Sequence, residues 1–363
     1  MSAARGWRIA GLLACVAACA WATSRAAAAG ASLTTALGLI GGLSWAQVAG
    51  LALLWVLGLY AHAVVLAASL PGLTRRRALA LNLAGSAVSG VLPLGGLAGA
   101  ALNLTMIRSW GHSALDFARF LTVAKACDVV AKLLMPAAAL TVLLGCGVLT
   151  PAAAGPWIVA AGVAFAVGSL LLRALCGRAT ALLRAVRAAA RASSWVTRRR
   201  DHPVGASWPA AVAELLTGTD LLVRRRRVAL TLGTAGYLIA QGALLWCCLR
   251  AVGVQAMPAV VFGGLVAERL TTLAVVTPGG TGPAEAATVT TLIALGTDAT
   301  GALAGVLLFR AFVSVAAILV GAAVALGWWA PRTTRARRDR ARQDQAHKDQ
   351  AHQDQAHQDE ARC

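Results

Sequence analysis

Thr277-Pro278-Gly279-Gly280-Thr281-Gly282-Pro283-Ala284-Glu285 is the stretch that decides the fold, because it places two prolines, three glycines and a carboxylate between two apolar segments. Backbone groups in hydrocarbon must hydrogen-bond within the protein, and proline interrupts the helix that would satisfy them. Such a break is tolerated only where the freed amide groups face protein or a water-filled cavity. Breaks of this kind are typical of transport sites.

The composition around this stretch is that of a membrane protein. Hydrophobic residues make up 58% of the 363 positions, charged residues make up 13%, and the mean hydropathy is +0.70. An ordinary soluble domain carries about 25% charged residues. The long apolar runs therefore predict an all-α, polytopic bundle of transmembrane helices.

The positive charge is concentrated in a few segments beside the apolar runs. The formal net charge is +19, and basic residues cluster near the N-terminus, at 75–77, across 173–227 and at 332–342. The positive-inside bias places these segments, including the C-terminus, on the cytoplasmic side of the plasma membrane. The basic 176–227 loop either binds anionic lipids of the inner leaflet or serves only as a solvated topology determinant. Nucleic acid is not expected as a partner, because the basic loops carry no stacking aromatics.

Six full spans and two interrupted stretches account for the apolar sequence. The spans are predicted at Ile9–Ala22, Trp45–Leu70, Ala114–Gly147, Trp157–Leu175, Val228–Val252 and Thr300–Trp329. The interrupted stretches, Ala78–Gly111 and Pro258–Gly296, each have the length of two half-membrane helices, which predicts re-entrant helical hairpins. Residues 1–330 would then form one transmembrane domain, followed by a polar, disordered tail over 331–363. The first span is either retained or cleaved as a signal peptide.

The two interrupted stretches share a pattern. Pro93 precedes Gly111 by eighteen residues, and Pro278 precedes Gly296 by the same interval. In the predicted topology one stretch enters from the cytoplasm and the other from outside, which is the arrangement of inverted repeats around a transporter site. The alternative is that two glycine-rich kinks in alanine-rich helices resemble one another by chance.

Lys125, Asp128 and Lys132 form one group of charges at membrane depth. Their spacing of three and four residues places them on one helix face. Asp128 can pair fully with only one of the two lysines, so the other would be available for a phosphate group. The alternative is a structural ion pair near one end of a long helix.

Glu285 and Arg310 form the second group. Glu285 stands in the first turn after Pro283, where the N-terminus of a helix stabilises a negative charge. Arg310, in the following span, is the partner we expect, because arginine binds carboxylate or phosphate through two parallel hydrogen bonds. The neighbouring glycines would let backbone amides approach such a group closely. The alternative is that Glu285 caps a helix and meets no ligand.

No pattern in the sequence indicates catalysis. The eight cysteines show no spacing typical of metal sites, and no zinc-protease, phosphate-binding or nucleophile-elbow motif is present. We therefore predict no catalytic residue, no metal and no cofactor, and we expect that the protein is not an enzyme.

The second interrupted stretch resembles the transmembrane region of lysylphosphatidylglycerol synthases, a family also described as flippase-like. The resemblance rests on Pro278-Gly279-Gly280-x-Gly282-x-x-Glu285 followed by Arg310 in the next span. The resemblance implies a polytopic membrane protein that moves lipids or lipid-linked groups between leaflets.

The first half of the chain resembles the same family more loosely. The turn Leu92-Pro93-Leu94-Gly95-Gly96, followed by Arg108, matches the first-half pattern of the family. Lys125 and Asp128 match part of a following Glu-Arg-x-x-Asp pattern, but Ala124 replaces the glutamate. That departure weakens any specific role assigned to this segment.

Pattern and resemblance together predict an anionic substrate, either a phospholipid or a polyprenyl-linked glycan. The predicted substrate-binding residues are Pro278, Gly279, Gly280, Gly282, Glu285, Arg310, Lys125, Asp128, Pro93, Gly95, Gly96 and Arg108. The sequence after Trp329 is too short and polar for the aminoacyl-transferase domain of the synthases, so we expect no synthase activity. The alternatives are a membrane-embedded transferase that uses a phospholipid donor and a non-transporting assembly partner of a membrane glycosyltransferase.

Overall fold

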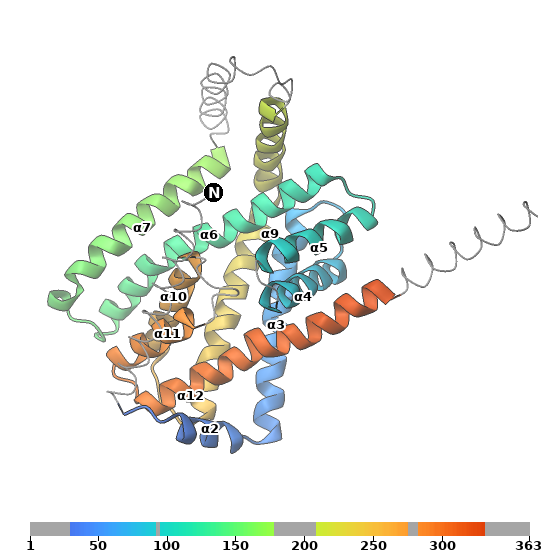
Figure 1. The fold of residues 1–363 in the computed structure, drawn as a ribbon. Helices are drawn as coiled ribbons and strands as arrows, with labels where there is room; N and C mark the ends of the chain where they lie inside the picture. Colours follow the sequence, from blue (N-terminus) through green and yellow to red (C-terminus); the bar gives the residue numbers. More distant parts are fainter. Residues whose placement is uncertain (1–29, 92–94, 178–207, 275–281, 331–363) are drawn as a thin grey trace, which may run out of the picture.

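A computed structural model describes residues 30–91, 95–177, 208–274 and 282–330 of the chain (Figure 1). All regular structure in these ranges is helical, which confirms the predicted all-α fold. The helices are α2 (Leu33–Gly41), α3 (Trp45–Ser69), α4 (Arg75–Val91), α5 (Gly95–Ser109), α6 (Ala114–Gly145), α7 (Pro151–Gly177), α9 (Trp208–Ala251), α10 (Pro258–Thr271), α11 (Pro283–Ala294) and α12 (Ala299–Arg310). A short 3-10 turn, η2 (Thr272–Ala274), follows α10.

Four of the described helices are long and apolar enough to cross a membrane. They are Trp45–Ser69, Ala114–Gly145, Gly218–Ala251 and Ala299–Ala330, and each coincides with a predicted span. The apolar part of α7, Trp157–Arg173, is shorter than a span, and the first predicted span, Ile9–Ala22, lies outside the described residues. Many large apolar side chains on the long helices point away from the protein, as lipid-facing residues do.

The helix α9 begins well before the point that the sequence predicts. We expect the span to start at Val228, after the basic loop, whereas α9 already begins at Trp208 and includes Arg224–Arg227. Asp220 lies one turn before Arg224 on the same helix face, and its carboxylate contacts the guanidinium at 3.1 Å. Hydropathy therefore marks where this helix becomes apolar, and it misses the charged turns that precede this point.

The two interrupted stretches both fold as pairs of short antiparallel helices. In the first pair, Gly99 of α5 lies so close to Gly85 and Ser89 of α4 that a larger side chain would not fit. In the second pair, Gly264 of α10 lies against Thr288 and Leu292 of α11. Small residues at such positions let helix backbones approach closely. The tips of both pairs, at 92–94 and 275–281, lie outside the described residues, and their re-entrant placement in the membrane stays a prediction.

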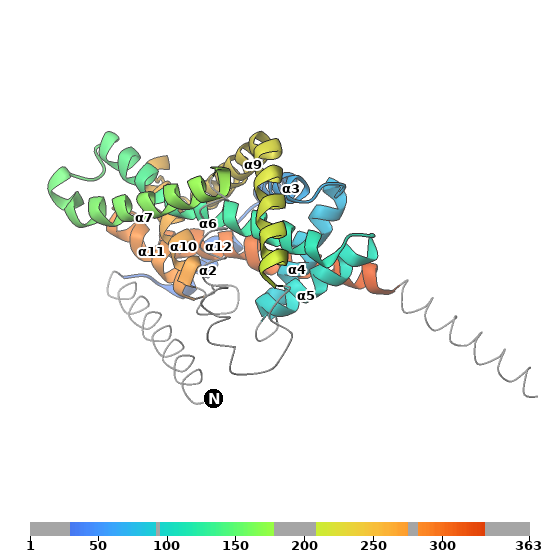
Figure 2. The ribbon, with the colours of Figure 1, turned by 90° about the horizontal axis from the view of Figure 1, so that it is seen from above.

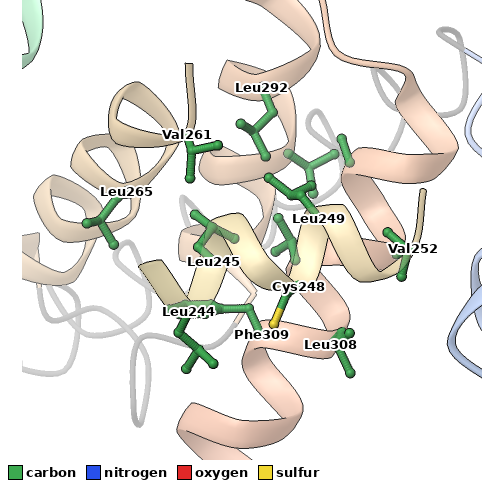
Figure 3. Close-up of a cluster of buried hydrophobic side chains, with 14 of the residues drawn as sticks. Leu244, Leu245, Cys248, Leu249, Val252, Val261, Leu265, Leu292, Leu308 and Phe309 are labelled. Carbon is green, nitrogen blue, oxygen red and sulfur yellow. The ribbon is translucent and has the colours of Figure 1, made fainter. Parts of the chain in front are cut away.

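A buried core connects α10, α11 and α12 to the long helix α9. Leu245 and Leu249 of α9 contribute to this core together with Leu265 of α10, Leu292 of α11 and Phe309 of α12 (Figure 3). Each of these five side chains is at most 1% exposed. The packing fixes the helices that carry the charged residues at membrane depth.

The last helix of the described chain crosses from one hairpin to the other (Figures 1 and 2). After Arg310 the helix passes through a π-helical segment, η4 (Ala311–Ala316), and continues to Ala330. Gly321 lies against the backbone of Leu83 on α4, and Gly90 of α4 lies against Ile318. The α4–α5 hairpin therefore packs beside the continuation of this helix, about two to three helical turns beyond Arg310.

Candidate functional site

Arg310 stands at the centre of a buried charged network. It is the last residue of α12, next to Phe309 in the core, and it is 8% exposed. Its Nε lies 3.1 Å from Oε1 of Glu285, and its Nη2 lies 3.3 Å from Oε1 of Glu268. The ion pair that the sequence predicts between Glu285 and Arg310 is therefore present. The π-helical segment follows immediately, and such segments are frequent at functional sites.

Glu285 uses its two carboxylate oxygens for different tasks. Its Oε2 accepts a hydrogen bond of 2.6 Å from the backbone N–H of Gly282, at the N-terminus of α11, while its Oε1 faces Arg310. Gly282 has a φ of 91°, a conformation that glycine adopts at little cost. Glu285 thus caps the start of α11 with one oxygen and contacts Arg310 with the other.

Glu268 and Arg269, which the sequence does not single out as binding residues, complete the network. Both lie near the end of α10, and Glu268 is 3% exposed. Arg269 Nε lies 3.2 Å from Glu268 Oε2, so the two oxygens of Glu268 face two different arginines. Their only signal in the sequence is that they are charged residues within an apolar stretch.

The two buried guanidinium groups retain unused hydrogen-bonding capacity. The contacts above have the distances of hydrogen bonds but not their angles. Nε and Nη2 of both Arg269 and Arg310, and Oε2 of Glu268, are buried and form no well-angled hydrogen bond with a described residue, although three of the four nitrogens face a carboxylate oxygen at 3.1–3.3 Å. Buried polar groups in proteins nearly always find a partner, which can be a ligand or water.

Two aromatic side chains extend the network toward α3. The guanidinium carbon of Arg269 lies 5.7 Å from the centre of the Tyr237 ring on α9, in a cation–π arrangement. The Tyr237 ring lies 4.6 Å from the ring of His62 on α3, measured between centroids. His62 and Arg269 in turn lie within electrostatic range of Asp128 on α6. Residues of six helices thus meet around one site.

Asp128 pairs with one of the two lysines on its face of α6, as the sequence predicts. Lys132 Nζ lies 2.8 Å from Asp128 Oδ2, and Lys132 is buried. Lys125 is exposed and makes no ion pair with any described residue. Asp128 therefore neutralises Lys132, and Lys125 keeps its charge.

The predicted site residues of the first hairpin lie apart from this network. Gly95 is buried against the backbone of Ser89, Gly96 faces open space, and Arg108 is exposed at the opposite end of α5. Arg108 makes no ion pair within the described ranges, and a basic residue in the last turn is favourable for the helix dipole. The remaining predicted residues, Pro93, Pro278, Gly279 and Gly280, lie outside the described residues.

A separate cavity lies at the far end of the bundle from the first hairpin. Its volume is about 660 Å³, and its lining includes Gly147, Gly253 and Gly296 at the ends of α6, α9 and α11. None of the charged residues around Arg310 contributes to it. No group of three or more His, Cys, Asp or Glu side chains within the described residues could hold a metal ion.

The comparison with known families agrees with this architecture. The family model of the lysylphosphatidylglycerol synthase transmembrane region matches residues 8–321. A comparison with curated proteins gives no match. The match covers most of the sequence, including both hairpins and all the helices that carry the charged network. The chain therefore belongs to the family of the lysylphosphatidylglycerol synthase transmembrane region.

Proposed function

We propose that the protein is a lipid translocase that moves a phosphate-bearing lipid headgroup between the leaflets of the plasma membrane. The family connects the chain with lipid handling in a membrane. The single observation that supports the finer assignment is the pair of buried guanidinium groups, Arg269 and Arg310, which lie side by side on Glu268 at membrane depth. Arginine matches the geometry of phosphate better than any other side chain does.

The energetics of the network favour a ligand over a purely structural role. An isolated charge at the centre of a membrane helix costs about 2.5 to 3.5 kcal/mol on translocon scales. The carboxylates of Glu268 and Glu285 offset this cost for the two arginines, but their contacts with the guanidinium groups are poorly angled for hydrogen bonds. A phosphate oxygen could accept better-aligned bonds from the same groups. Glu285 is the carboxylate that can move aside, because its side chain is 22% exposed while that of Glu268 is 3% exposed.

The placement of the network also suits a translocase. Arg310 stands about 16 Å along its helix, close to the middle of a bilayer whose hydrocarbon core is about 30 Å thick. A headgroup that crosses the membrane meets its largest electrostatic barrier at this depth. Fixed arginines there would replace part of the hydration that the phosphate loses.

Leaflet exchange in reconstituted liposomes tests the proposal. A fluorescent phosphatidylglycerol and a fluorescent diacylglycerol are incorporated separately, and the fraction accessible to a membrane-impermeant quencher is followed over time. We expect the protein to accelerate exchange of the anionic lipid well above that in protein-free liposomes. Equal acceleration of both lipids would mean that the protein perturbs the bilayer without recognising phosphate, and no acceleration would contradict the proposal.

A further inference from the structure

Lys125 and Arg310 occupy corresponding positions on two helices. Lys125 stands as many residues after Ala114, the first residue of α6, as Arg310 stands after Ala299, the first residue of α12. Both are therefore about 16 Å from the starts of their helices. Each helix directly follows the second helix of a hairpin, α5 or α11.

The turns that lead into α6 and α12 are built alike. Gly111 and Gly296 have φ values of 88° and 90°. The N–H of each glycine donates to the carbonyl three residues earlier, at 3.1 Å and 3.0 Å respectively. Two residues after each glycine stands an N-cap, Ser113 in one turn and Asp298 in the other, whose side chain accepts a bond from the backbone three residues later.

Other turns in the described ranges share only parts of this combination. Gly72 has a φ of 84°, and Thr74, two residues later, accepts a bond of 3.4 Å from the N–H of Arg77. The backbone bond of that turn, however, runs from Leu73 to Leu70. Gly147 and Gly253 end α6 and α9 with the same pattern of backbone bonds, but no N-cap follows two residues later. The spacing between the two halves also matches: Gly296 follows Gly111 by the same number of residues as Arg310 follows Lys125. Matching geometry and matching spacing are what two copies of one structural unit would produce.

The two basic residues differ in their surroundings. Arg310 is buried between two carboxylates, whereas Lys125 is exposed and forms no ion pair with a described residue. Lys125 stands in the first half of α6, before the part of the helix that is apolar enough to cross a membrane, so its ammonium group can meet water or an anion. Asp128 is not an ion-pair partner of Lys125, because its carboxylate pairs with Lys132 at 2.8 Å.

His62 connects the two positions. It lies within electrostatic range of Lys125 and Asp128 on one helix and of Arg269 on another. Its ring also contacts Tyr237, over which Arg269 is placed. His62 therefore lies beside both the Lys125–Asp128 face of α6 and the cation–π contact of Arg269.

We propose that Lys125 is a second phosphate-binding station for the lipid headgroup, and that it is the structural counterpart of Arg310 in the other half of the chain. This inference rests on the proposed function. In this arrangement the headgroup binds Lys125 from the leaflet beside the α4–α5 hairpin and Arg310 from the leaflet beside the α10–α11 hairpin. In the structure Arg310 contacts Glu285, whereas Lys125 is exposed and forms no ion pair with a described residue.

Equilibrium binding of a short-chain phosphatidylglycerol to the purified full chain tests the second station. We compare wild type, Lys125→Gln, Lys125→Arg and Arg76→Gln, the last as a control that removes an exposed charge outside the site. We expect Lys125→Gln to lose one of two binding events or to weaken it about tenfold or more. Lys125→Arg should retain it, and Arg76→Gln should bind as wild type does. Binding by Lys125→Gln that equals wild type would overturn the proposal.

The source of the phosphate is tested in the same measurement. Short-chain diacylglycerol should not compete for the Lys125-dependent event. If inorganic phosphate binds there and the lipid does not, Lys125 belongs to a free-anion site and the station is disproved. Loss of all lipid binding in wild type would contradict the proposed function itself, whereas intact binding that is insensitive to Lys125 would contradict only the second station.

Discussion

Arg310 Nη2 on α12 lies 3.3 Å from Oε1 of Glu268 on α10, and both side chains are buried. The contact joins two helices that are far apart in the sequence, and the other oxygen of Glu268 faces Arg269. Glu268 therefore holds two guanidinium groups in place at once. A carboxylate in this position holds the two guanidinium groups in place, although their Nε and Nη2 form no well-angled hydrogen bond with a described residue.

Removing the charge of Glu268 should destabilise the protein more than removing that of Glu285. The variant Glu268→Gln leaves two buried arginines beside a single remaining carboxylate, and breaking a buried pair costs about 3 to 5 kcal/mol. Glu285 is more exposed, so water can compensate for part of its loss. Thermal unfolding in detergent, with Asp220→Asn as a control on an exposed ion pair, should rank Glu268→Gln lowest. An unchanged midpoint for Glu268→Gln would show that its two contacts contribute nothing to stability.

Exchanging the charges of Glu285 and Arg310 should not restore the site. The double variant Glu285→Arg with Arg310→Glu restores one pair, but it places a glutamate at position 310 against Glu268. Two buried like charges in contact are unfavourable, so we expect the double variant to accumulate less than wild type and to be inactive. Expression and leaflet exchange measure both effects. Full activity of the exchanged protein would mean that the order of the charges is irrelevant.

A side chain at Gly282 should strain the start of α11. The variant Gly282→Ala must adopt a φ of 91° with a ψ of −75°, a sparsely populated conformation that costs about 1 to 3 kcal/mol for residues with a Cβ atom. The strain acts on the N–H that binds Glu285, so exchange activity should fall together with stability. Gly162→Ala on α7 is the control, because open space surrounds Gly162 and it belongs to no predicted site. If both variants behave alike, the positive φ at Gly282 is not needed.

The orientation of the bundle can be tested with single cysteines. The positive-inside bias predicts that Arg76→Cys reacts with an impermeant thiol reagent only after the membrane is opened. The native Cys146 is exposed at the C-terminal end of α6, which the predicted topology places outside. It should therefore react in intact cells when it is the single cysteine of the protein. The reverse pattern of labelling would invert the topology.

The sequence predicts the helices better than it predicts the site. Hydropathy locates the four long spans, because length and apolar composition are local properties. It misplaces the start of α9 at Val228, since the charged turns before that residue are helical without being apolar. Spacing and motif also indicate the Glu285–Arg310 pair, because a glutamate after a Gly-Pro break at membrane depth calls for a nearby positive charge.

Glu268 and Arg269 could not be assigned to the site in the same way. No helical periodicity links them to Glu285 or Arg310, and their contacts form only because α10, α11 and α12 pack on a common core. Sequence likewise could not decide which lysine Asp128 neutralises, because both stand at favourable spacing. The packing of α6 decides it, by burying Lys132 and exposing Lys125.

The most direct test of the central claim is the leaflet exchange rate of Arg310→Lys. Lysine keeps the positive charge for Glu268 and Glu285, so the variant should fold, but it cannot bind phosphate through two parallel hydrogen bonds. We expect exchange of fluorescent phosphatidylglycerol to slow about tenfold or more, with Arg76→Lys at the wild-type rate. An Arg310→Lys protein that exchanges the lipid as fast as wild type would show that the buried guanidinium does not carry the headgroup.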